Sequence, residues 1–445
     1  MIDLSPAIIT VIMMGGLLVG ILLGFPLAYV FGFMAIVGGY IVWGGRVPDV
    51  IYMRIFDIMT DYTLLAIPLF VFMGIMLERS GIAGRLYDAL YFWFGGFRGG
   101  LAISTVLIGV IMAACVGIIA ATIVMLSAVA LPSMLKRGYS KSLASASVCV
   151  SGTLGIFIPP SIMLVVYGPM AGISVGRLFY GAIIPGLVLS GLYIIYIAVR
   201  SFFQPQIAPA VPLDEIRKVS FGRKTIMLLA AAGPTAILIF SVLGVIFFGI
   251  APPTEAAGIG AFIATLLVIA YGKFSFKVLK EVALGTMKAC GYIFLILSLA
   301  VSFTSVFIGA GGGRVMEEVI MGAPGGRWGI FATIMLVLFL LGKFIDWIGI
   351  VFIMVPIITP VGEALGFDPI WFAIMVCLNL QMSFITPPVA LAIFYTKGVC
   401  APELGVTMGD IIRGVFPFVG LIVIALILCT IFPELILWLP GMMIK

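Results

Sequence analysis

Two stretches, SGTLGIFIPPS at Ser151–Ser161 and NLQMSFITPP at Asn379–Pro388, decide the fold. Each lies inside a long apolar segment, 142–176 or 370–396, that would otherwise be a membrane crossing. Proline removes a backbone donor and clashes with the preceding turn, so a Pro-Pro pair after hydroxyl and amide side chains predicts unwound backbone at membrane depth. Free carbonyls there can coordinate a cation, and half-helix N-termini can face an anion. Two simple kinks are the alternative, but interruptions at matching positions favour a transporter binding site.

The composition requires a bilayer as solvent. Of 445 residues, 63% are hydrophobic and only 9% are charged, and there is no histidine. A soluble fold could not bury so much apolar surface. The net charge of +6 comes from short basic runs between apolar stretches, which indicates cytoplasmic loops rather than a nucleic-acid site.

The chain aligns with itself at an offset of 228 residues. PPSIMLVVY, which begins at Pro159, falls on PPVALAIFY, which begins at Pro387. The loop Lys136–Lys141 carries a charge of +3, whereas its mate Glu363–Asp368 carries −2. Corresponding loops with opposite net charge should lie on opposite sides of the membrane, so the repeats are predicted to be inverted.

Inversion requires an odd number of crossings in each repeat, although each half has six apolar stretches. One stretch per half must therefore enter and leave on the same face. We expect an all-α polytopic membrane protein with two inverted repeats, re-entrant hairpins and broken helices, and with both termini in the periplasm. The predicted parts are a first repeat (1–200, with hairpin 101–130 and broken helix 142–176), a linker (201–222) and a second repeat (223–445, with hairpin 328–360 and broken helix 370–396).

The hairpin tips carry further candidates. The first tip, Ala113–Thr122, is rich in small residues, which suit either an ion site or close helix packing. The second tip, GKFIDW, carries Lys343 and Asp346. An ionisable residue in hydrocarbon is a functional hypothesis by default. Asp346 would ligate Na⁺, carry a proton, or form a structural pair with Lys343 at i, i+3.

Four motifs together are similar to one family: LPSMLKRGYSKSLASASVCVSGTLGIFIPPS from Leu131, PTEAA from Pro253, GKFIDW from Gly342, and NLQMSFITPP from Asn379. They resemble the large, DctM-like membrane subunit of tripartite ATP-independent periplasmic (TRAP) transporters. The resemblance implies an ion-transporter-superfamily fold that works as an elevator in the bacterial inner membrane. It also implies Na⁺-driven uptake of a small organic acid, a periplasmic substrate-binding protein and a small four-helix membrane subunit as partners, and lipid as the surroundings.

The same resemblance implies two Na⁺ sites and one solute site. The Na⁺ ligands would be Gly117, Thr122, Ser151 and Gly152 in the first half, and Asp346, Asn379 and Ser383 in the second. The solute would lie between the broken segments, at Ser151, Thr153, Pro159, Ser161, Asn379, Gln381 and Thr386. One departure is notable, because many relatives have a Ser-Gly-Ser type first tip and this chain has Ala114–Gly117. Fewer hydroxyls there leave more of the coordination to backbone carbonyls.

Other function classes fit less well. An intramembrane enzyme would lack histidine and a nucleophile–base pair, and no GxxxxGK[ST] motif is present for ATP. The serious alternative is an anion or ion transporter, or an antiporter, of the same fold that needs no binding protein. Dependence on a soluble binding protein would separate the two.

Overall fold

The computed structural model describes residues 4–443, and over this range the chain is helical, without strands. Nine helical segments in the described range are long and apolar enough to cross a membrane. Large apolar side chains such as Phe240, Phe262 and Phe416 are exposed on the outer helices. This surface fits lipid as the surrounding solvent.

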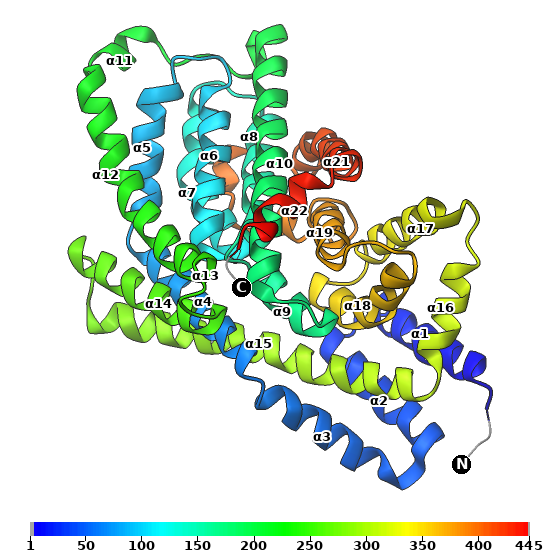
Figure 1. Ribbon diagram of the computed structural model, residues 1–445. Coiled ribbons are helices and arrows are strands. Elements are labelled where there is room, and N and C mark those ends of the chain that lie inside the picture. Colours follow the sequence, from blue (N-terminus) through cyan, green and yellow to red (C-terminus); the bar gives the residue numbers. More distant parts are fainter. Residues whose placement is uncertain (1–3, 444–445) are drawn as a thin grey trace.

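The first group of helices, which we call the frame, comprises the segments before the hairpins in each half. α15 packs against α2, α3 and α4, and it crosses the lower part of the molecule in Figure 1, above α3. The frame helices are α1 (Pro6–Leu22), α2 (Leu27–Trp43), α3 (Val47–Met59), α4 (Ala66–Arg79), α5 (Ile82–Phe94), α12 (Phe221–Ile239), α13 (Val245–Phe247), α14 (Pro253–Ala270), α15 (Phe276–Gly309) and α16 (Gly312–Met321).

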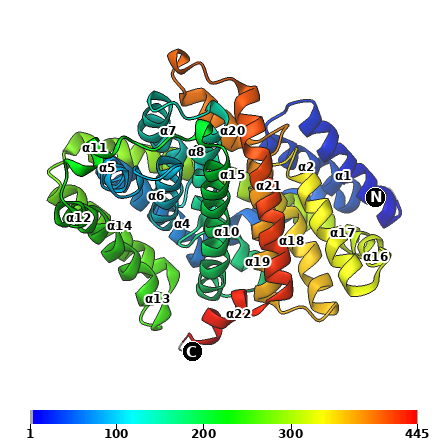
Figure 2. The same ribbon diagram turned by 90° about the horizontal axis from the view of Figure 1, so that it is seen from above.

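The second group, which we call the central body, contains the hairpins, the broken helices and the helix after each. α10 and α21 lie side by side in the middle of the molecule, between α12–α14 and α16–α18 (Figure 2). The body comprises α6 (Gly100–Val116), α7 (Ile119–Lys136), α8 (Lys141–Thr153), α9 (Ile162–Ala171), α10 (Val175–Phe203), α17 (Gly326–Leu341), α18 (Trp347–Ala364), α19 (Pro369–Leu380), α20 (Leu391–Val399), α21 (Met408–Ile431) and the short α22 (Glu434–Gly441).

Helix boundaries in the two halves recur at the sequence offset. α7 starts at residue 119 and α18 at 347, and α8 starts at 141 and α19 at 369, so both pairs differ by 228. Gly138 and Gly366, which are also 228 residues apart, both adopt positive φ, at 80° and 72°. Both follow a hairpin, where glycine reaches the left-handed region without a Cβ penalty. The opposite orientation of the halves across the bilayer stays a prediction.

The observed element bounds differ modestly from the predicted ones. The hairpins run longer than predicted, over 100–136 and 326–364, and the first broken helix ends earlier, at Ala171. The linker between the halves is shorter, because α10 continues to Phe203 and α12 already starts at Phe221. The apolar stretches underestimated the length of the hairpins, because the outer ends of the hairpins carry polar residues.

The linker, which contains α11 (Leu213–Arg217), is docked rather than free. The Glu215 carboxylate accepts hydrogen bonds from the Tyr91 hydroxyl at 2.8 Å and from Arg137 Nη2 at 2.5 Å. These two hydrogen bonds hold the pKa of the Glu215 carboxyl below its usual range, and the bond from Tyr91 has the larger effect. One carboxylate thus joins the linker to α5 of the frame and to the end of α7 in the central body.

Helices inside the central body approach closely where one of them has glycine. A Cβ added to Gly414 of α21 would lie 2.1 Å from the carbonyl oxygen of Ser142 at the start of α8. Gly109 of α6 lies against Ser151 of α8 in the same way, since a Cβ added to Gly109 would lie 2.5 Å from the Ser151 Cβ. Small residues permit such backbone approach in membrane bundles.

We predict that Gly414→Ala lowers the free energy of unfolding by about 1–3 kcal/mol, since the methyl group would overlap a backbone oxygen that cannot move away easily. Gly420→Ala is the matched control, because it lies on the same helix with no atom within 4 Å of the added Cβ. Thermal unfolding of the purified protein in detergent measures both. Equal unfolding temperatures for the two variants would contradict this packing.

Candidate functional site

The two halves interlock at the broken helices. α9, which ends the first broken helix, packs against α18 of the second hairpin. In return, α20 packs against α7 and α8 of the first half. A polar contact crosses the same boundary, since Cys149 Sγ lies 3.0 Å from Thr396 Oγ1. Each broken segment is therefore enclosed by elements of both repeats.

The first hairpin tip covers the first break. Gly117 ends α6 with φ of +65°, and a Cβ there would lie 3.2 Å from the carbonyl oxygen of Pro160. The Thr122 hydroxyl is fully buried and donates to the Ile118 carbonyl at 3.3 Å. A Cβ on Gly155, in the short 3₁₀ turn after α8, would lie 3.6 Å from Thr122 Oγ1. The structure thus brings Gly117 and Thr122 onto the break, at Pro160 and Gly155.

Ser151, Gly152 and Thr153 do not form the expected loop, because they are the last turn of helix α8. Ser151 packs on Gly109, and a Cβ on Gly152 would meet the Ile123 side chain, so both face the hairpin helices rather than the tip. The hydroxyls of Ser151 and Thr153 donate to carbonyls of their own helix, at 2.5 and 3.0 Å. The break begins only at Leu154, where the 3₁₀ turn starts.

The remaining first-half candidates lie in the break itself. Pro159 and Ser161 are buried, and the Pro159–Pro160 peptide bond is cis. Ser161 is the N-cap of α9, where its side chain accepts a hydrogen bond from the Leu164 amide. The Ser161 hydroxyl in turn donates to the Ile156 carbonyl. The hydroxyl therefore stabilises the start of the second half-helix.

The second tip covers the second break. A Cβ on Gly342 would lie 1.8 Å from Ser383 Oγ, and the Val389 amide donates to the Lys343 carbonyl at 3.2 Å. Asn379, near the end of α19, is buried and donates from Nδ2 to the Met335 carbonyl of α17 at 2.9 Å. These contacts hold the second hairpin against the second broken helix.

Lys343 and Asp346 are not the helical i, i+3 pair that the sequence allowed. The backbone between Leu341 and Trp347 is non-helical, and Asp346 caps α18 by accepting from the Trp347 amide at 2.8 Å. The Lys343 ammonium instead lies 4.6 Å from the centre of the Phe339 ring. The ion pairs that the structure records within residues 4–443 are Arg54–Asp57, Arg79–Glu281 and Arg137–Glu215.

Two buried polar side chains at the second break have no partner. Neither amide atom of Gln381 makes a hydrogen bond, although the residue is fully buried. The Ser383 hydroxyl, also buried, is likewise unpaired. Thr386 differs, because its hydroxyl donates to the Met382 carbonyl at 2.6 Å. An unpaired buried amide costs several kcal/mol, roughly 2–7 by transfer estimates, so each such group calls for a missing partner.

Helix ends supply the electrostatics of both tip–break contacts. The C-termini of α6, α8, α17 and α19 point toward them, and their last carbonyls lack intrahelical donors. The N-termini of α7, α9, α18 and α20 start there, and α7 and α20 have no side-chain cap. Carbonyl ends attract a cation and amide ends attract an anion. The described residues hold no cluster of three or more His, Cys, Asp or Glu.

The frame contacts both hairpins through backbone groups. A Cβ on Gly74 of α4 would lie 2.4 Å from the carbonyl oxygen of Val116 at the first tip. On the other side, the buried Thr304 hydroxyl of α15 donates to the Phe352 carbonyl of α18 at 2.9 Å. Pro356, four residues later in α18, lacks the amide that would normally bond this carbonyl. Thr304 replaces the missing donor.

Several cavities lie outside the tip–break contacts. One, of about 400 Å³, opens between the frame and the central body and is lined by Tyr62, Thr63, Gly168–Val175 and Pro252–Thr254. Thr254 belongs to the PTEAA motif, whose Glu255 is exposed in the first turn of α14. The walls of this cavity come from three segments that are distant in the sequence, so no single motif predicts it.

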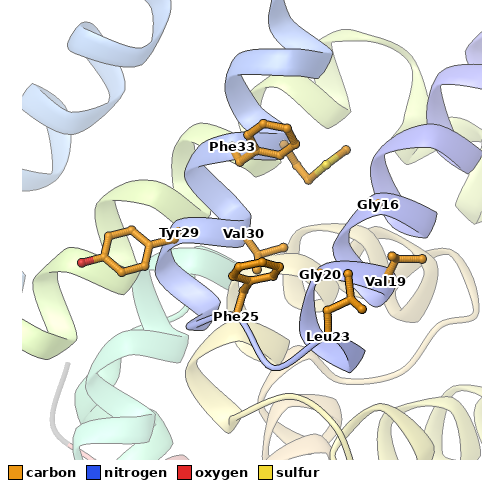
Figure 3. Close-up of a pocket in the computed structure, with 9 residues that line it drawn as sticks. Gly16, Val19, Gly20, Leu23, Phe25, Tyr29, Val30 and Phe33 are labelled. Atoms are coloured by element: carbon orange, nitrogen blue, oxygen red, sulfur yellow. The ribbon is translucent and has the colours of Figure 1, made fainter.

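Another of these cavities is an apolar groove of about 460 Å³ between α1 and α2. Gly16, Val19 and Gly20 line one side of it, and Tyr29 and Phe33 the other (Figure 3). It has no charged side chain in its lining, so it offers no site for an organic acid.

Comparisons with known proteins agree with this arrangement. Residues 14–435 match the family model described as "Tripartite ATP-independent periplasmic transporter, DctM component". The chain belongs to this family of TRAP large permease subunits. The permease is therefore a transport protein and not an enzyme, and it is a multi-pass membrane protein.

Individual relatives cover most of the permease. It is 32% identical over 408 residues to the C4-dicarboxylate TRAP transporter large permease protein DctM of Vibrio cholerae, covering 86% of each chain. It is 28% identical to the ectoine TRAP transporter large permease protein TeaC of Halomonas elongata, covering 97% of this chain and 99% of that one.

A solved structure shares the fold of the permease. The YdaH transporter of Alcanivorax borkumensis, described as having an unusual topology, superposes with a TM-score of 0.64 at 13% identity. The match covers 97% of this chain and 100% of that chain. The predicted all-helical fold is confirmed over the described residues, and this transporter shares it.

We predict that Gly342→Ala separates the second tip from its break, because the methyl group would occupy the position of Ser383 Oγ. The expected loss of unfolding free energy is about 1–3 kcal/mol. Adding Ser383→Gly should restore much of the stability by removing the obstructing side chain. Gly398→Ala, with nothing within 4 Å of its added Cβ, is the control. If Gly342→Ala unfolds at the temperature of this control, the contact is wrongly placed.

Proposed function

We propose that this chain is the permease of a secondary transporter that imports a small organic acid, driven by a Na⁺ gradient. A periplasmic binding protein delivers the solute, and a small four-helix membrane subunit completes the complex in the bacterial inner membrane. Both termini of the chain lie in the periplasm. Family membership supports the coarse assignment, and relatives named for C4-dicarboxylates and ectoine support a small polar solute.

One observation carries the proposal: the fully buried Gln381, in the 3₁₀ turn of the second break, has no hydrogen-bond partner. A structural glutamine in a membrane core would be paired with a neighbouring side chain or backbone group. A glutamine that binds solute or a hydrated ion gains its partners only when the ligand is present. Ser383, unpaired and packed on Gly342, belongs to the same ligand-facing surface.

Na⁺ acts first in the proposed cycle. Carbonyl ends of α6 and α8, with Thr122, form the first ion site, and those of α17 and α19, with Asp346, Asn379 and Ser383, form the second. Bound Na⁺ orders each tip against its break, and the cation charge then favours a carboxylate between the two breaks. Because coupling is reciprocal, solute must also tighten Na⁺ binding.

The proposed movement is an elevator. The central body slides against the frame and carries the solute across. The Gly74–Val116 and Thr304–Phe352 contacts join the two parts and must be remade in the other state.

Uptake into proteoliposomes tests the function. The permease is reconstituted with its small membrane subunit, and a loaded binding protein is added outside under an inward Na⁺ gradient or a K⁺ control. Uptake that needs both Na⁺ and the binding protein supports the proposal. Uptake with Na⁺ alone would favour the binding-protein-independent transporter, and uptake driven only by protons would contradict Na⁺ coupling.

Gln381→Leu separates a ligand role from a structural one. We predict a loss of uptake of at least about tenfold, since a polar group of the bound ligand then lacks its partner in the site. The unfolding temperature should stay the same or rise, because an unpaired amide is replaced by an apolar group of similar size. Gln204→Leu, in the exposed start of the linker, is the control. Lower stability with unchanged uptake would assign Gln381 a structural role.

A further inference from the structure

Lys343 is a cation in a part of the chain that otherwise lacks basic residues. The two tips, 113–122 and 342–347, and the two broken segments, 151–161 and 379–388, contain no other Lys or Arg. A charged side chain at membrane depth is costly and is retained where it pairs with another group. The charge of Lys343 therefore requires a partner.

The described part of the chain does not provide an anionic partner. Lys343 takes part in none of the ion pairs that the structure records. The nearest carboxylate along the chain, Asp346, is directed to the Trp347 amide at the start of α18. The ammonium rests 4.6 Å from the Phe339 ring centre, and the residue is half-buried. A ring face stabilises a cation less than a carboxylate does.

The position of Lys343 places it at the second break. Its carbonyl accepts from the Val389 amide at 3.2 Å, directly after the Pro387–Pro388 pair. The preceding Gly342 lies against Ser383, whose buried hydroxyl is unpaired. Lys343, whose ammonium has three donors, is thus the chain neighbour of the glycine that packs on the unpaired Ser383 hydroxyl. Both groups suit a carboxylate.

We propose that Lys343 binds a carboxylate of the transported solute. The ammonium leaves the Phe339 ring and pairs with the carboxylate, while Ser383 donates its hydroxyl to the same group. This assignment rests on the proposed function and adds a residue that selects for negative charge. A solute with two carboxylates should therefore bind more tightly at this site than the same solute with one carboxylate converted to an amide.

The test compares succinate with succinamate, its mono-amide, as probes for the complete complex in proteoliposomes. For the wild type, we expect the half-saturation concentration of succinamate to exceed that of succinate at least about tenfold, as expected for loss of one charge-assisted pair. Lys343→Met should bring the two values together, and Lys343→Arg should keep them apart. Lys288→Met, which removes an exposed cation on α15, is the control.

Several results would contradict the assignment. One is an equal half-saturation concentration for both probes in the wild type. Another is a ratio of the two half-saturation concentrations that is unchanged in Lys343→Met. The third is binding of neither probe by the wild-type complex. A Lys343→Met defect that follows the anionic-lipid content of the vesicles, and not the charge of the probe, would assign the lysine to a lipid headgroup. Absence of Na⁺-driven uptake of any solute by the wild type would instead contradict the proposed function itself.

Discussion

Backbone amides and carbonyls need partners inside a membrane, and this constraint governs the structure. Helices satisfy it along their length, but the breaks after α8 and α19 interrupt the ladder within the bilayer. Unwound backbone is tolerated at such depth only when protein encloses it. The hairpin tips and the half-helices of the opposite repeat provide that enclosure, with Gly117 on Pro160 and Lys343 on Val389 as the direct contacts.

The same constraint explains how distant elements are joined. Pro356 leaves the Phe352 carbonyl without its helical donor, and Thr304 of the frame supplies one. Pro433 leaves the Cys429 carbonyl unbonded in the same way, and Trp371 Nε1 donates to it at 2.9 Å. Prolines therefore create acceptors that neighbouring helices use. The contact at Thr304, like the Gly74–Val116 contact, must break if the central body moves against the frame.

Much of the architecture could be predicted from the sequence, because proline restricts the backbone at its own position in the chain. Proline pairs marked both breaks, and the 228-residue offset matched helix starts in the two halves. The roles of individual side chains did not follow, because they depend on contacts across the fold. Ser151 looked like a loop ligand, yet α8 continues past it and packs it on Gly109.

The electrostatic details were also set by tertiary structure. Spacing alone allowed a Lys343–Asp346 pair, but the non-helical tip turns the carboxylate to the Trp347 amide. The polar, proline-rich sequence of the linker does not indicate that Glu215 binds Tyr91 and Arg137. The complete burial of Gln381 without a partner has no signature in the sequence.

The central claim is that the unwound backbone of both breaks forms a Na⁺-dependent binding site. Hydrogen–deuterium exchange of the purified permease in Na⁺, compared with K⁺ at equal ionic strength, tests it most directly. Na⁺ should slow exchange in the segments 154–161 and 381–390 and in the two tips, while the frame helices exchange alike in both salts. Equal exchange of these segments in Na⁺ and K⁺ would contradict the account.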